Sequence, residues 1–182
     1  MRKSSLIIFI VVLCIGFSSC TKSSSYTTLD ASQYDKIVSE IPNSYTCMPS
    51  LDDLGAYTNI QINRRPVENV LFDTMDSINV IVTYSNENYL EMVESIDEKY
   101  VFLDQATEDI CDVEVIINGV EIKVVEYSNM HNQYCVKPYY MMLVGFDDSN
   151  NRIIYFYHWD IEVAKIEDLN SFIRNSYYMA GI

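Results

Sequence analysis

The chain has 182 residues, of which 49% are hydrophobic and 13% aromatic, and its formal net charge at neutral pH is −14. This apolar content excludes an intrinsically disordered chain, and the length allows one domain with a sizeable core but not comfortably two. A charge of this sign repels phosphate backbones, so we expect no nucleic-acid partner.

The first twenty residues have the organisation of an export signal. Arg2 and Lys3 precede an uninterrupted apolar run over residues 6–15, and the segment ends with two small residues before Cys20. A membrane-spanning helix needs about 20 apolar residues, so the run is too short to span, but it has the length of a signal-peptide core. Residues 1–19 are therefore interpreted as a signal peptide.

The end of this segment is Phe17-Ser18-Ser19-Cys20. It resembles the lipobox of bacterial lipoproteins, in which an apolar residue and two small residues precede a cysteine, although leucine is more usual where Phe17 stands. The resemblance implies cleavage before Cys20, acylation of its sulfur, and a lipid-anchored protein on the extracytoplasmic face of a cell membrane. Ordinary secretion without a lipid is the alternative.

Beyond the signal the chain is more acidic. Loss of Arg2 and Lys3 would change the formal charge to −16, because all 26 acidic residues lie after the signal. The Ser/Thr-rich residues 20–28 predict a flexible, lipid-anchored tether. Residues 29–182 are expected to form a single domain.

Two stretches near the start of this domain have the side chains of helix N-termini. Asp30 and Gln33 are spaced as in a capping box, and the apolar residues of 34–41 recur at helical spacing until Pro42 ends the run. Residues 50–53 repeat the capping pattern, and a glycine two positions later limits that helix to a single turn.

The middle of the chain alternates between strand and helix patterns. Residues 86–96 predict a helix with Leu90, Val93 and Ile96 on its apolar face. Residues 66–75 fit a helix or a buried strand equally well. Strands are expected where β-branched residues or polar-apolar alternation dominate, over 59–63, 78–84 and 100–103.

Asn118 and Gly119 predict a β-hairpin with a type I′ turn, because both residues tolerate positive φ. Counting outward from the turn places apolar pairs on one face and an opposite-charge pair on the other: Ile117–Val120, Val115–Ile122 and Val113–Val124, against Glu114–Lys123. A slip of one residue would destroy both patterns, so the register is well specified.

The remaining chain predicts two long strands, over 134–146 and 153–159, and a closing amphipathic helix over 166–177. Both strands are apolar on both faces, which is typical of the middle of a covered sheet, while Pro138 is expected at a break or an edge. The order of elements predicts an α+β domain. Short amphipathic helices would pack on an antiparallel sheet whose C-terminal part is a four-strand meander.

The strand over 153–159 supplies the candidate binding residues. Tyr155, Tyr157 and Trp159 share one of its faces, and His158 lies on the other. An exposed aromatic row would bind sugar rings or a protein partner. Burial of the row under the C-terminal helix is the alternative, and it is favoured because strands are enriched in aromatic residues anyway.

Cysteines and histidines are the other candidates for chemistry. Cys47, Cys111 and Cys135 remain after the signal and the anchor, so at most one internal disulfide can form. In the expected meander Cys111 and Cys135 lie too far apart for a bridge. A Cys/His nucleophile or a zinc site would combine Cys135 with His131 and His158, but no signature spacing supports either.

Residues 147–151 resemble a calcium-binding loop, but the glycine at the sixth position is missing and an ordinary turn is favoured. Phosphate-loop, serine-hydrolase and zinc-protease motifs are absent from the sequence. We therefore expect no cofactor and no resident metal.

The sequence thus predicts a non-enzymatic binding or interaction domain of the cell envelope. Its partners would be the lipid bilayer, through acylated Cys20, and an envelope protein or glycan. The alternatives are an envelope hydrolase that uses Cys/His chemistry and a protective or inhibitory protein that binds a basic partner.

Overall fold

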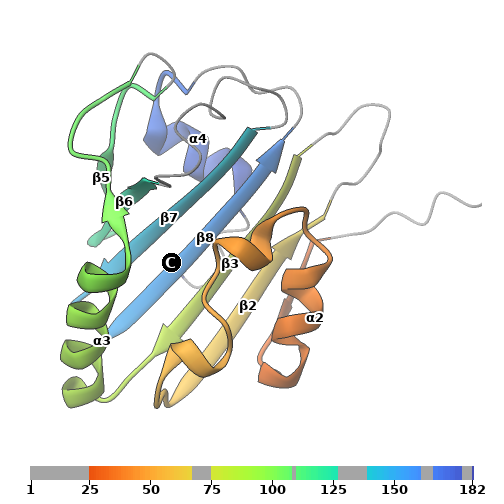
Figure 1. The fold of residues 1–182 in the computed structure, drawn as a ribbon, viewed down its shortest axis with the longest axis vertical. Coiled ribbons are helices and arrows are strands. Elements are labelled where there is room, and N and C mark those ends of the chain that lie inside the picture. The colour runs from red at the N-terminus through yellow and green to blue at the C-terminus, as the bar shows by residue number, and fades with distance from the viewer. Residues whose placement is uncertain (1–24, 67–74, 108–109, 127–138, 161–165, 178–181) are drawn as a thin grey trace, which may run out of the picture.

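The computed structural model describes residues 25–66, 75–107, 110–126, 139–160, 166–177 and 182. Its centre is an eight-stranded sheet in the order β1-β2-β3-β8-β7-β6-β4, with β5 paired to β6 (Figure 1). The paired strands are antiparallel throughout. Helices pack on this sheet, so the α+β class predicted from the sequence is confirmed.

The strands differ in length, and the longest lie at the centre. β3 (Met75–Thr83), β7 (Tyr139–Asp147) and β8 (Arg152–Asp160) have nine residues each. β8 pairs along its whole length with β3 on one side and β7 on the other, as expected for a strand that is apolar on both faces. The remaining strands are β1 (Tyr26–Thr28), β2 (Asn59–Arg65), β4 (Val101–Phe102), β5 (Glu114–Ile117) and β6 (Val120–Glu126).

The two faces of the sheet have different covers (Figure 1). On one face lie α2 (Tyr34–Ser39) and α3 (Asn86–Lys99), and on the other lies α4 (Leu169–Ser176). Three short 3₁₀ turns complete the first cover: η1 (Ala31–Gln33), η2 (Ser44–Thr46) and η3 (Asp52–Leu54).

Each face has its own hydrophobic core, and β8 contributes to both. Tyr155 and Tyr157 join the cluster under α2 and α3, whereas Ile154 and Phe156 join the cluster under α4. This alternation follows from the two-residue period of a strand, in which successive side chains point to opposite faces.

The predicted hairpin is confirmed in its register. Asn118 and Gly119 have φ angles of 54° and 87°, and the paired residues are the ones expected from the sequence. The pairing extends one step further, because the backbone N–H of Val124 donates to the carbonyl of Val113 at 2.9 Å. Ile117 and Val120 are buried, as required for the inner face.

Of the two predicted capping boxes, the one at Ser50 and Asp53 has both of the reciprocal hydrogen bonds that define this motif. The backbone N–H of Ser50 donates to the Asp53 carboxylate at 3.0 Å, and that of Asp53 donates to the Ser50 hydroxyl at 3.3 Å. Asp30 caps η1 by accepting from the backbone of Ser32, while the Gln33 amide donates to the Asp30 side chain rather than to its backbone.

Two predictions need correction. The tether predicted over 20–28 is too long, because Tyr26–Thr28 forms β1, where the Thr27 hydroxyl donates to Asn63 at 2.8 Å. In α3 the predicted apolar face is wrong at Leu90, which is 61% exposed. Tyr89 is buried instead, because its ring falls on the same stripe as Ile96 seven residues later.

Several predictions lie outside the described residues. They concern the signal peptide, Cys20, Pro138, most of 66–75 and the start of the strand predicted over 134–146. Within the described ranges, no helix is long and apolar enough to cross a membrane.

Candidate functional site

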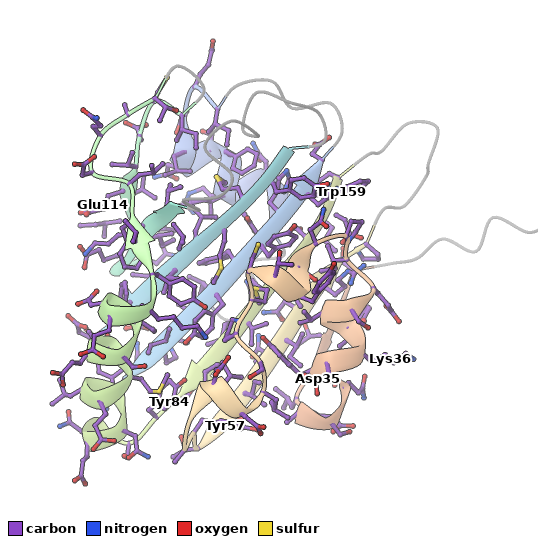
Figure 2. All side chains as sticks on the ribbon, viewed as in Figure 1. Asp35, Lys36, Tyr57, Tyr84, Glu114 and Trp159 are labelled. Atoms are coloured by element: carbon purple, nitrogen blue, oxygen red, sulfur yellow. The ribbon has the colours of Figure 1, made fainter. Side chains whose placement is uncertain are left out.

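The aromatic residues predicted for binding are largely inside the protein. Tyr155, Tyr157 and His158 are 1%, 0% and 0% exposed, and Trp159 is partly buried near the end of β8 (Figure 2). The tyrosines are covered by the layer of α2, the 3₁₀ turns and α3, not by the C-terminal helix. The favoured interpretation, that these tyrosines are core, is therefore correct, but the covering element was misidentified.

His158 lies on the opposite face, beneath α4. Its ring centroid is 4.7 Å from that of Phe172 and 5.9 Å from that of Tyr177, and its Nε2 is 3.9 Å from an Asp160 carboxylate oxygen. Burial lowers the pKa of His158 to about 4, although Asp160 acts in the opposite direction. The imidazole is therefore neutral at physiological pH and is held inside the core.

The structure does not bring the described cysteines to this histidine. Cys47 is buried in the core on the other face, and Cys111 is exposed; neither forms a disulfide bond with another described residue. Cys135 and His131, the other members of the predicted Cys/His and zinc sites, lie outside the described residues. In the part of the chain that is described, no three His, Cys, Asp or Glu side chains are grouped to hold a metal ion.

The segment compared with a calcium loop is a tight turn between β7 and β8. The buried Asp147 carboxylate accepts hydrogen bonds from the side chains of Asn150 and Arg152. Burial alone would raise the pKa of Asp147, but the donors of Asn150 and Arg152 outweigh it and the pKa is lowered. The carboxylate thus stabilises the turn and its own hairpin, in agreement with the favoured prediction.

A cluster of buried tyrosines holds an irregular segment, residues 42–54, on the sheet. Four of the tyrosine hydroxyls donate to backbone carbonyls of this segment, which has too little regular structure to satisfy its own carbonyls. The bonds are Tyr157 to Pro42 (2.8 Å), Tyr100 to Cys47 (3.5 Å), Tyr34 to Pro49 (2.6 Å) and Tyr84 to Leu54 (2.9 Å).

A fifth tyrosine, Tyr155, lies deeper and is hydrogen-bonded to the hydroxyl of Tyr84. Burial raises the pKa of all five phenols well above the usual value. The hydroxyls therefore keep their protons, and with them their hydrogen bonds, throughout the neutral pH range. We refer to Tyr34, Tyr84, Tyr100, Tyr155 and Tyr157 as the tyrosine cluster.

A surface hollow of about 210 Å³ lies between α2 and the segment that the tyrosine cluster holds. Its apolar walls come from Tyr34, Val38, Met48 and Pro49. Small-molecule pockets usually have about 300–1,000 Å³, so this hollow has room for a single side chain rather than for a larger ligand. Its rim is polar or amphipathic and consists of Asp35, Ser39, Tyr45 and Ser50.

The cover of this face of the sheet is strongly acidic. Residues 30–55 and 86–99, here called the acidic layer, contain ten acidic residues and two lysines, and all of these side chains are exposed. The two parts are joined, because the Asn88 side chain donates to the Ala56 carbonyl at 2.7 Å and Lys99 pairs with Asp53 at 3.0 Å. The second lysine, Lys36, extends from the outer side of α2 (Figure 2).

No family model, curated protein or solved structure matches the chain. The hollow is therefore interpreted from its own geometry. Sequence reasoning missed it, because Tyr34 and Val38 fall on the apolar face of the helix predicted over 34–41, and no element was predicted for residues 43–49. The high tyrosine content, 15 residues, is a signal for buried hydroxyl donors. The spacing of these residues in the sequence does not show which hydroxyl donates to which carbonyl.

Proposed function

We propose that the protein is a lipid-anchored, extracytoplasmic interaction domain, without enzymatic activity, whose acidic layer binds a basic protein of the cell envelope. The observation that carries this proposal is the net negative charge of the acidic layer, which has ten acidic residues and two lysines, all of them exposed. The described residues that pack on the other core outside the strands, 103–107, 110–113 and 166–177, have four acidic residues and one arginine. The acidic layer therefore has the larger negative charge, which attracts a cationic surface.

An acidic surface of this kind selects its partner mainly through the approach of opposite charges. Complementary potentials raise the association rate and orient the partner before contact. The field of exposed charges reaches about 8 Å into physiological saline, so several carboxylates on one face act together on an arriving surface. A protective or inhibitory role toward a basic protein belongs to the same class of function.

The anchor on Cys20 would keep this surface close to the bilayer. Because β1 begins at Tyr26, residues 21–25 alone separate Cys20 from the sheet. A fully extended chain of this length spans about 18 Å. The domain would therefore stay closer to the membrane than the longer predicted tether would allow. Its partner would then be another component of the same envelope.

The other candidate functions find less support. A Cys/His hydrolase that uses His158 would need this imidazole at the surface, but His158 is fully buried beneath α4. A glycan site on β8 would need the exposed aromatic row, but Tyr155 and Tyr157 are core residues.

The anchor is tested by Cys20→Ala followed by membrane fractionation. We expect the variant to leave the membrane fraction, because a lipid on this sulfur is the proposed attachment. Retention in the membrane at the wild-type level would contradict the anchor.

The partner is tested by photo-cross-linking in intact cells with a photoreactive amino acid placed at single exposed positions. Leu90 on α3 reports on the acidic layer, and Asn175 on α4 is the matched position on the other face. We expect a cross-linked protein of high isoelectric point from position 90 and none from position 175. Equal cross-linking from both positions, or an acidic protein captured at position 90, would contradict the proposed function.

A further inference from the structure

We infer that the hollow beside α2 receives one arginine side chain of the basic partner. This inference rests on the proposed function, and it names the place in the acidic layer where the partner is recognised. The hollow differs from the rest of the layer because it combines a carboxylate with an aromatic ring and apolar walls.

The apolar part of the hollow matches the stem of a long cationic side chain. Arginine buries its methylene groups on apolar surface while it keeps the charged head near water. Val38 and Met48 are buried and supply such a surface, and Pro49 closes the same side. A volume of about 210 Å³ accommodates one such stem but not a folded segment of the partner.

The rim places a negative charge at the mouth of the hollow. Asp35 is exposed and has no ion-pair partner among the described residues. Lys36, its neighbour in sequence, extends from the outer side of α2 and leaves this carboxylate available (Figure 2). A guanidinium group forms parallel hydrogen bonds to a carboxylate, which a lysine ammonium does not.

An aromatic ring stands at the same rim. Tyr45 is 69% exposed, so the face of its ring is accessible to a ligand. Arginine stacks on tyrosine faces through cation–π attraction, and this contact favours arginine over lysine.

The hollow is already formed in the unbound protein. The bond from the Tyr34 hydroxyl to the Pro49 carbonyl joins its two walls, and the buried Ser44 hydroxyl donates to the carbonyls of Val38 and Ile41. A rigid site loses little conformational entropy when a ligand enters, so binding energy is not spent on ordering this segment.

The experiment measures the affinity of the full-length protein, in detergent, for fluorescein-labelled octa-arginine by fluorescence anisotropy. Asp35→Asn removes the rim charge without changing shape, and Asp52→Asn removes one exposed charge of the same layer outside the hollow. Because a hydrogen bond to a charged group is lost, we expect Asp35→Asn to weaken binding about tenfold. Asp52→Asn should weaken it less than about threefold.

The ring is tested in the same assay. Tyr45→Ala should weaken octa-arginine binding about threefold, the loss expected for an exposed cation–π contact. Tyr45→Phe keeps the ring and should bind as the wild type does.

The outcomes separate the inference from the proposed function. If Asp35→Asn and Asp52→Asn weaken binding equally, and Tyr45→Ala has no effect, the hollow is not the arginine site although the acidic layer still binds cations. If the wild-type protein does not bind octa-arginine at all, both the inference and the proposed function fail.

Discussion

On the face of the sheet that carries α2 and α3, six tyrosines are buried in the core, whereas the core described under α4 contains one. The difference follows from the kind of cover. A regular helix such as α4 satisfies the hydrogen bonds of its own backbone. The core beneath it therefore needs no extra donors and can consist mainly of aliphatic and phenylalanine side chains. The irregular residues 42–54 leave carbonyls that need donors, and tyrosine supplies a donor together with a large apolar ring.

The comparison extends to charge. The tyrosine-rich face has an acidic exterior and a preformed hollow, whereas the described cover of the other face has fewer acidic residues and rests on a core with one tyrosine. The irregular segment, the acidic layer and the hollow thus all lie on the same face of the sheet. This coincidence is why the functional proposals are placed on that face.

The largest expected difference between the faces is their response to alkaline pH. Burial raises the pKa of the tyrosine cluster above the value of about 10 in the unfolded chain, so the phenols favour the folded state only while they are protonated. This stability is complete below pH 10 and is lost as the pH rises further. We expect cooperative unfolding above about pH 10, seen together by circular dichroism and tyrosinate absorbance. Ionisation of all the tyrosines near pH 10 without loss of structure would contradict the buried cluster.

The α4 face should respond to acid instead. The pKa of His158 falls from 6.5 to about 4 on folding, so the unfolded chain takes up a proton in this interval before the folded protein does. The contribution of His158 is therefore complete above pH 6.5 and is lost as the pH falls to 4. The loss is about 3 kcal/mol of unfolding free energy, measured by urea denaturation at several pH values.

His158→Phe should abolish most of the slope between pH 6.5 and pH 4. The aspartates whose pKa is lowered, among them Asp53 and Asp147, add to the slope near pH 4 in both proteins, so the difference between the wild type and the variant isolates His158. An unchanged slope in the variant would show that another group is responsible.

A smaller effect tests the individual tyrosine hydroxyls. Tyr34→Phe and Tyr157→Phe each remove one hydroxyl that donates to a carbonyl of residues 42–54. Each variant should lose about 1 kcal/mol of unfolding free energy, the usual value of one such bond. Tyr45→Phe is the matched control at an exposed position and should change stability by less than about 0.5 kcal/mol. Equal stabilities for all three variants would mean that the hydroxyls do not hold the segment.

The parts of the fold that local rules determine could be predicted from the sequence. The hairpin at Asn118-Gly119 follows from positive φ and strand alternation, and the central position of β8 follows from its apolar residues on both faces. The cap formed by Ser50 and Asp53 follows from their spacing.

The errors have a common cause, which is that tertiary contacts decide between locally equal choices. Leu90 and Tyr89 both continue an apolar stripe, but only the tyrosine has a hydroxyl that reaches Asp148, at 2.6 Å. Tyr26–Thr28 is too short to show strand alternation, although tyrosine and threonine favour strands, and it pairs with the edge of β2. The hollow arises from contacts between α2 and residues 44–50, which no sequence spacing encodes.

The central claim is that the acidic layer, rather than the total charge of the protein, recognises a basic partner. It is tested by the affinity of the full-length protein for octa-arginine at salt concentrations from about 0.05 to 0.15 M. One variant replaces Glu87, Glu91 and Glu94 of α3 by glutamine. The matched variant removes three exposed carboxylates outside the acidic layer, by Asp104→Asn, Asp112→Asn and Glu167→Gln.

We predict that salt weakens binding of the wild-type protein. The α3 variant should lose roughly tenfold in affinity at low salt, because each exposed charge contributes about 0.2–1 kcal/mol. The matched variant should stay close to the wild type. Equal losses in the two variants, or binding that does not depend on salt, would contradict the claim.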